Sequence, residues 1–166
     1  MKKLFVIILA ILFLSLFFFP PTPTPTPTIT PEVSTPYPTP QPHIKAKVTK
    51  VIDGDTIVIS DGNQVRLIGI DTPELKKCFY QEAKDTTTAL VSGQEVELES
   101  DINDKDDYGR LLRYVYVEGE MVNEFLVTWG FAEAEDFFPE KRHYTRFLSA
   151  QKEAQKQNRG LWGKCN

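Results

Sequence analysis

A proline-rich tract divides this sequence and leaves only the part after it for a folded core. The chain has 166 residues and 12 prolines, and every proline except Pro73 and Pro139 lies within residues 20–42. Because proline has no N–H donor, the tract cannot form helix or sheet, and we expect a semi-rigid spacer of roughly 70 Å when extended. We therefore predict a targeting segment at 1–19, a disordered Pro/Thr-rich linker at 20–42 and one folded domain at 43–166.

The segment before this tract is typical of a protein that leaves the cytoplasm. Residues 4–19 are apolar apart from Ser15 and follow Lys2 and Lys3. The run lacks small residues at its end, which favours an uncleaved membrane anchor, but it is short beside the roughly 17–25 residues of a transmembrane helix. A cleavable signal peptide stays open. In both cases we expect an extracytoplasmic domain, either facing outward from the membrane or secreted.

The cysteines and histidines limit the metal and redox chemistry. Two cysteines in an exported chain favour one disulfide, Cys78–Cys165, which could add roughly 4–5 kcal/mol through loop closure. The chain has two histidines and no CxxC pair, so a zinc site is not expected. We also expect a monomer without a protein partner.

The charge of the folded part argues against a broad nucleic-acid-binding surface. Of 19 basic and 23 acidic residues, only Lys2, Lys3 and Glu32 precede position 43, which leaves 17 basic, 22 acidic and a net charge of −5. A domain that grips nucleic acid over a basic surface has the opposite sign. Either a nucleic-acid substrate is held locally at a metal site, or the substrate is something else.

The pattern of the folded part predicts an α+β, mainly β domain. β-Branched runs at 46–52, 56–60 and 64–70, separated by Asp-Gly turns, predict a three-strand meander. Two further strands are predicted at 94–99 and 111–117, and helices at about 79–92, 121–129 and 140–158. Five short strands with about three helices suit the five-stranded oligonucleotide/oligosaccharide-binding (OB) barrel.

Acidic residues flank the second and third predicted strands. Asp55 begins one strand and Asp71 ends the next, so antiparallel pairing through the turn at 61–63 brings both to the same end. Asp53 and Glu74 lie nearby in the sequence. Carboxylate oxygens of this kind are preferred by calcium, although an isolated Asp-Gly-Asp is more often a plain turn. The acidic run at 101–107 does not fit an EF-hand loop, because its sixth position is Asp106 and not glycine.

Two arginines add the chemistry of phosphate recognition. Arg66 alternates with apolar residues on the third predicted strand, and Arg110 immediately precedes the fifth. Solvated strand-edge arginines are common. However, guanidinium groups match the oxygens of a phosphodiester in its transition state, so these arginines and acids together indicate a phosphoryl-transfer site.

The ordered motifs VIDGDT, RLIGIDTPE and DDYGR resemble the staphylococcal (micrococcal) nuclease-like, or thermonuclease, family over about residues 46–162. The resemblance implies an OB-fold endonuclease that uses Ca²⁺, cuts DNA and RNA with little sequence choice and leaves 3′-phosphates. It also implies that Asp55, Asp71 and the Thr72 carbonyl bind calcium, with Asp53 as an acid beside the metal. Glu74 would be the general base, and Arg66 and Arg110 would bind the phosphate. Loss of Glu74 or either arginine should nearly abolish cleavage and leave the fold intact.

The substrate-binding side departs from the family. Tyrosines after the short helix hold substrate in family members, whereas this chain has Phe137 and Phe138 there, next to Glu135 and Asp136. We expect Tyr108, Phe137 and Phe138 to contact the substrate, with weaker binding and stronger salt dependence than the family implies. The alternative is a non-catalytic OB-fold module that binds nucleic acid or protein, but such a module would be expected to lack the arginines or the glutamate.

Overall fold

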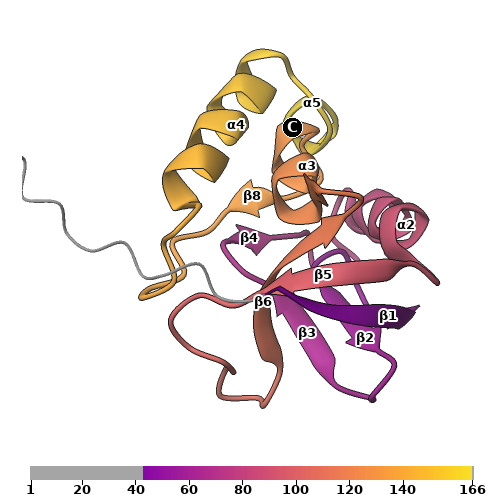
Figure 1. Cartoon of the computed structure of the whole chain (residues 1–166). Coiled ribbons are helices and arrows are strands. Elements are labelled where there is room, and N and C mark those ends of the chain that lie inside the picture. The colour runs from indigo at the N-terminus through magenta and orange to yellow at the C-terminus, as the bar shows by residue number, and fades with distance from the viewer. Residues whose placement is uncertain (1–42, 166) are drawn as a thin grey trace, which may run out of the picture. The chain divides into compact units, whose positions relative to one another are not determined.

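Five strands close into a barrel in the computed structural model, which describes residues 43–165 (Figure 1). The pairs β1–β2, β2–β3, β1–β5 and β5–β6 are antiparallel, and a parallel β3–β6 pair closes the barrel. This confirms the predicted five-stranded OB barrel. The barrel strands are β1 (Ile44–Val51), β2 (Thr56–Ile59), β3 (Gln64–Leu67), β5 (Glu95–Glu99) and β6 (Leu111–Val117).

The predicted third strand is wrong in one respect, because it divides into two at Gly69. The chain bends there with a φ of 75°, which glycine adopts without a steric cost. A Cβ on Gly69 would also lie 3.0 Å from the Phe147 ring. The bend sends β4 (Ile70–Asp71) away from the barrel, where it pairs antiparallel with β8 (Glu133–Ala134).

Helices cover one end and one side of the barrel. Figure 1 shows α3 (Val122–Thr128), α4 (Tyr144–Lys156) and α5 (Leu161–Lys164) gathered above the barrel end, with α2 (Tyr80–Val91) at its side. β7 (Glu120–Met121) leads from β6 into α3. The predicted helices exist with shorter bounds, and α4 starts at Tyr144 because the residues after Pro139 form an irregular loop.

The barrel interior and the helices share one apolar core. Aliphatic residues of every barrel strand are buried in it, and Tyr114 of β6 packs edge-on against Phe147 of α4. Burial of this apolar surface is the main force that holds the helices on the barrel. Within residues 43–165, no helix combines the length and the apolar character needed to cross a membrane. The predicted targeting segment and linker lie outside the described residues.

A disulfide joins the chain between β4 and α2 to the end of α5. The sulfurs of Cys78 and Cys165 are bonded, and 87 positions separate the two residues. The C-terminal end of the described chain is thereby fixed to the segment that follows Asp71.

Candidate active site

Asp55 is buried where the loop before β2 meets the end of β4. Its Oδ2 accepts hydrogen bonds from the backbone N–H and the hydroxyl of Thr72, both at 2.9 Å. The contact depends on Gly54, because a Cβ there would lie 2.8 Å from the Thr72 side chain. Thr87 of α2 donates to the Gly54 carbonyl at 2.6 Å and holds the loop in place. Asp55 therefore lies against Thr72, the residue that follows Asp71.

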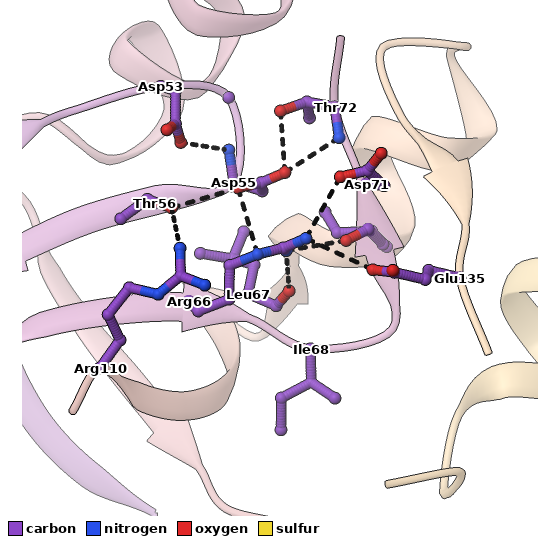
Figure 2. A network of polar contacts seen from close by, with 12 residues as sticks. Asp53, Asp55, Thr56, Arg66, Leu67, Ile68, Asp71, Thr72, Arg110 and Glu135 are labelled. Carbon is purple, nitrogen blue, oxygen red and sulfur yellow. Dashed lines mark hydrogen bonds and ion pairs between the residues drawn. The ribbon is translucent and has the colours of Figure 1, made fainter. Parts of the chain in front are cut away.

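Arg66 connects both predicted metal-binding carboxylates (Figure 2). Its Nη1 donates to the carbonyls of Leu67 and Ile70, both at 2.7 Å, so the side chain spans the bend at Gly69. Its Nε lies 3.4 Å from Asp55 Oδ1, and its Nη2 lies 3.4 Å from Asp71 Oδ1. Only 7% of the Arg66 side chain is exposed. The guanidinium is thus part of the barrel wall.

The acids around Arg66 repel one another. Partial burial, followed by the charge of Asp55, raises the pKa of Asp71 from its ordinary 3.8 to about 6. Burial and the same Asp55 charge also raise the pKa of Asp53, whose Oδ1 accepts a hydrogen bond from the Asp55 backbone N–H at 3.3 Å. Burial and mutual repulsion thus both oppose full ionisation of these two carboxyl groups.

Arg110 approaches the same carboxylate from another direction. It lies just before β6, and its Nε forms an ion pair with Asp106 Oδ2 at 2.7 Å. Its Nη1 is 3.5 Å from the Thr56 hydroxyl, which in turn donates to Asp55 Oδ1 at 3.2 Å. Figure 2 shows Arg66 and Arg110 converging on the region of Asp55 and Thr56. The parallel β3–β6 pairing produces this arrangement, because it sets the start of β6 beside β3.

Glu74 lies beside this network on the exposed segment between β4 and α2. It lines a pocket of about 310 Å³ together with Asp71 and Thr72, and the Cys78–Cys165 disulfide lines the same pocket. The charge of Glu74 contributes to the raised pKa of Asp71, so the two carboxylates are within electrostatic range. The Glu74 carbonyl accepts a hydrogen bond from the Lys77 backbone N–H at 2.8 Å, which tightens the turn after Pro73.

The three aromatic residues predicted to hold substrate divide into two groups. The Tyr108 ring is 86% exposed and lies 5.5 Å from the Arg110 guanidinium carbon. The Phe137 ring lies 5.6 Å from that of Arg66. Phe138 is 81% exposed and faces Lys141 instead. Tyr108 and Phe137 therefore each accompany one arginine, while Phe138 lies with a lysine outside the network.

The structure adds three contacts to those of the predicted site residues. Thr56 links Arg110 to Asp55, Asp106 holds Arg110, and Glu135 lies 3.4 Å from Arg66 Nη2. Thr56 belongs to the VIDGDT motif and Asp106 lies four residues before Arg110, so both carried a local signal. Glu135 was expected only to weaken substrate binding, and the pairing of β4 with β8 is what brings it to Arg66.

The donor set suits a hard cation such as calcium. Asp55 and Asp71 supply carboxylate oxygens, and the Thr72 backbone lies against Asp55. Within residues 43–165, no group of three or more His, Cys, Asp or Glu side chains is arranged as a metal cluster. Two carboxylates and a carbonyl would leave several of the roughly six to eight calcium positions to water and substrate oxygens. The mutual repulsion of these acids agrees with such an open site.

Comparisons with known proteins agree with the fold and the motifs. Residues 64–164 match the model of the family described as staphylococcal nuclease homologue. A thermonuclease of Staphylococcus hyicus is 43% identical over 125 residues, which cover 70% of this chain and 74% of that protein. A thermonuclease of Staphylococcus intermedius is 41% identical over 69% of this chain and 74% of its own length. An endonuclease of Bacillus subtilis (strain 168) is 36% identical over 73% of this chain and 63% of its own length. The chain therefore belongs to the staphylococcal nuclease family.

Proposed function

We propose that this protein is a calcium-dependent endonuclease that hydrolyses phosphodiester bonds in DNA and RNA with little sequence preference and leaves 3′-phosphates. The observation that carries the proposal is the convergence of two arginines on one buried carboxylate. Arg66 meets Asp55 directly, and Arg110 meets it through Thr56. The thermonuclease and endonuclease relatives support a nuclease activity for the same fold.

The two guanidinium groups explain how an acidic domain could hold a phosphodiester. The domain carries a net charge of −5 after position 42, so its overall field repels nucleic acid. Arg66 and Arg110 place two fixed positive charges at one point. Negative charge builds up on the phosphate oxygens during attack, and donors fixed in advance stabilise that charge without reorganising. Binding would therefore be local, and catalysis would depend on both arginines.

Glu74 is the candidate general base. Its carboxylate is exposed beside Asp71 and would accept a proton from the water that attacks phosphorus. The bond between phosphorus and the 5′ oxygen then breaks, and the departing oxygen takes a proton from solvent. The phosphate stays on the 3′ side. Asp55, Asp71 and the Thr72 carbonyl would hold calcium, which when bound supplies positive charge beside the phosphate. Asp53 would orient Asp55 through the backbone hydrogen bond.

A plasmid-digestion assay of the full chain, with calcium and then with chelator, tests this proposal. Glu74→Gln should cleave about 10²–10⁴-fold more slowly and retain oligonucleotide binding. The products of the parent protein should resist extension by a polymerase until a phosphatase removes the 3′-phosphate. Retention of oligonucleotides without cleavage at any calcium concentration would instead identify a non-catalytic binding module. Parental activity in calcium-bound Glu74→Gln would show that another group is the base.

We also propose that the protein acts outside the cytoplasm as a monomer, tethered by residues 1–19 or released from them. The Cys78–Cys165 disulfide supports an oxidising compartment. Fractionation of cells that make the full chain tests the location, with intact mass measurement to reveal cleavage. Recovery of the protein only from the cytoplasmic fraction would contradict it. Light scattering of the detergent-solubilised chain tests the monomer.

A further inference from the structure

A carboxylate that the proposed chemistry does not use lies against the Arg66 guanidinium. Glu135 Oε2 is 3.4 Å from Arg66 Nη2, the same nitrogen that lies 3.4 Å from Asp71. The Glu135 side chain is 42% exposed, whereas the Arg66 side chain is 7% exposed. Figure 2 shows Glu135 pointing toward Arg66 from a segment other than those that carry Asp55 and Asp71. The exposed approach to this nitrogen thus carries a negative charge.

The backbone of Glu135 is held by hydrogen bonds, whereas its side chain is partly exposed to solvent. Its N–H donates to the Gly69 carbonyl at 2.9 Å, next to the Ile70 carbonyl that binds Arg66. The preceding Ala134 N–H donates to the Gln151 side chain of α4 at 2.6 Å. Glu135 is therefore tethered beside Arg66, where a tethered group competes at a high effective concentration.

Glu135 is not needed to orient Arg66. The guanidinium is already held by the carbonyls of Leu67 and Ile70 at 2.7 Å each, and its Nε faces Asp55. The Glu135 contact is longer and partly solvated, and such ion pairs contribute little to structure. Its carboxylate occupies Arg66 Nη2, which is the donor that an incoming phosphate oxygen would need.

Resting on the nuclease function proposed above, we propose that Glu135 is a built-in competitor for the phosphate at Arg66. Each substrate or product must displace its carboxylate in order to contact Nη2. A nucleic-acid chain can add contacts at Arg110 and Tyr108 and can therefore displace Glu135, whereas a mononucleotide product has fewer such contacts. Glu135 thereby lowers the affinity for substrate and product alike, so that the free 3′-nucleotide is held weakly and leaves, whereas the added contacts keep a polymeric substrate bound.

Steady-state kinetics of the full chain on a single-stranded oligonucleotide tests this role, with thymidine 3′-phosphate as inhibitor. Glu135→Gln should lower KM by about two- to fivefold, lower the inhibition constant at least as much, and leave kcat within about twofold. Glu135→Asp should give a smaller change. Asp136→Asn is the matched control, because it removes the same charge at the next residue. The Asp136 side chain is paired with Lys141 and not with Arg66.

Four outcomes would overturn the proposal. An unchanged KM in Glu135→Gln, or an equal decrease in Asp136→Asn, would mean that local competition is absent. A fall in kcat would mean that Glu135 positions Arg66. If the parent protein did not cleave, the nuclease proposal would fail first. Calorimetric titration with thymidine 3′-phosphate would still decide the role of Glu135. Competition by Glu135 requires that Glu135→Gln bind the nucleotide more tightly than the parent, and unchanged binding would refute it.

Discussion

Arg66 and Arg110 offer the same chemical group to the site from two different structural settings. Arg66 lies in β3, is 7% exposed and binds two backbone carbonyls as well as carboxylates. Arg110 follows a loop, is 26% exposed and has its main ion pair with Asp106 of that loop. The difference teaches that, under the proposed function, one arginine would serve both the barrel and the reaction, whereas the other would serve mainly the reaction. Stability and activity should therefore separate at position 110 and not at position 66.

The largest effect is expected for Arg66→Ala. The substitution leaves Asp55 as a buried charge without its partner and removes the donor from the Leu67 and Ile70 carbonyls. The free energy of unfolding should fall by about 3–5 kcal/mol, and kcat by about 10²–10³-fold. Urea unfolding and initial rates measure the two losses. The sequence alone suggested an intact fold for this variant, and the buried position of Arg66 changes that expectation.

Arg110→Ala should lose activity without losing stability. We expect kcat to fall by about 10²–10³-fold and the free energy of unfolding to change by less than about 1 kcal/mol. The ion pair with Asp106 is local and partly solvated, so its loss leaves no buried charge in the core. The same urea and rate measurements apply. A loss of stability equal to that of Arg66→Ala would break the comparison between the two arginines.

The carboxylates beside the two arginines should change the stability of the protein with pH in opposite directions. The larger change is expected for Asp71. Its pKa is about 6 in the folded protein against an ordinary 3.8, so the folded state holds the proton more tightly. Calcium-free protein should therefore lose stability as pH rises from about 4 through 6. Asp71→Asn removes this loss, so the variant should be more stable than the parent above pH 6. Below pH 4, the stability of the two proteins should change with pH at the same rate. Thermal unfolding in chelator over this range checks the sign.

Asp106 should show the smaller and opposite dependence. Burial opposes ionisation of Asp106, but hydrogen bonds from Arg110 outweigh it and lower the pKa below the ordinary 3.8. Its contribution to stability is therefore present above pH 3.8 and is lost as pH falls through the lowered pKa. Asp106→Asn should be less stable than the parent at neutral pH, and the difference should shrink in acid. A difference that is constant with pH would contradict the assigned ion pair.

Local patterns in the sequence predicted most of the barrel, because its first three strands are β-branched runs joined by short turns. The Asp61-Gly62-Asn63 turn joins β2 to β3, with the Asn63 N–H bound to Asp61 at 2.9 Å. The bend at Gly69 was not predicted, since residues 64–70 form one continuous apolar pattern. The β4–β8 pair was missed as well, because each strand has two residues and their pairing is non-local.

Only the part of the candidate site that follows from the pairing of neighbouring strands was predicted. Antiparallel β2 and β3 bring Asp55 to Arg66, whereas the turn at 61–63 was enough to infer only that Asp55 and Asp71 lie at the same end. The Arg66 bonds to Leu67 and Ile70 follow from the bend at Gly69, and the path from Arg110 through Thr56 follows from barrel closure. The bend is local but was hidden by the apolar pattern of residues 64–70, whereas barrel closure is tertiary and no local motif encodes it. The contact of Glu135 with Arg66 was hidden for the same reason.

The covalent link between Cys78 and Cys165 has a consequence for proteolysis. Residues 101–109 form a largely solvent-exposed loop between β5 and β6, and the loop lies inside the span that the disulfide closes. Exposed loop tips are preferred sites of nicking. A single cut there produces two fragments that remain joined as one molecule, so they separate under denaturing conditions only after reduction. In a protease-rich environment, the nicked barrel would keep Asp55 and Arg66 on the same covalent framework as Arg110.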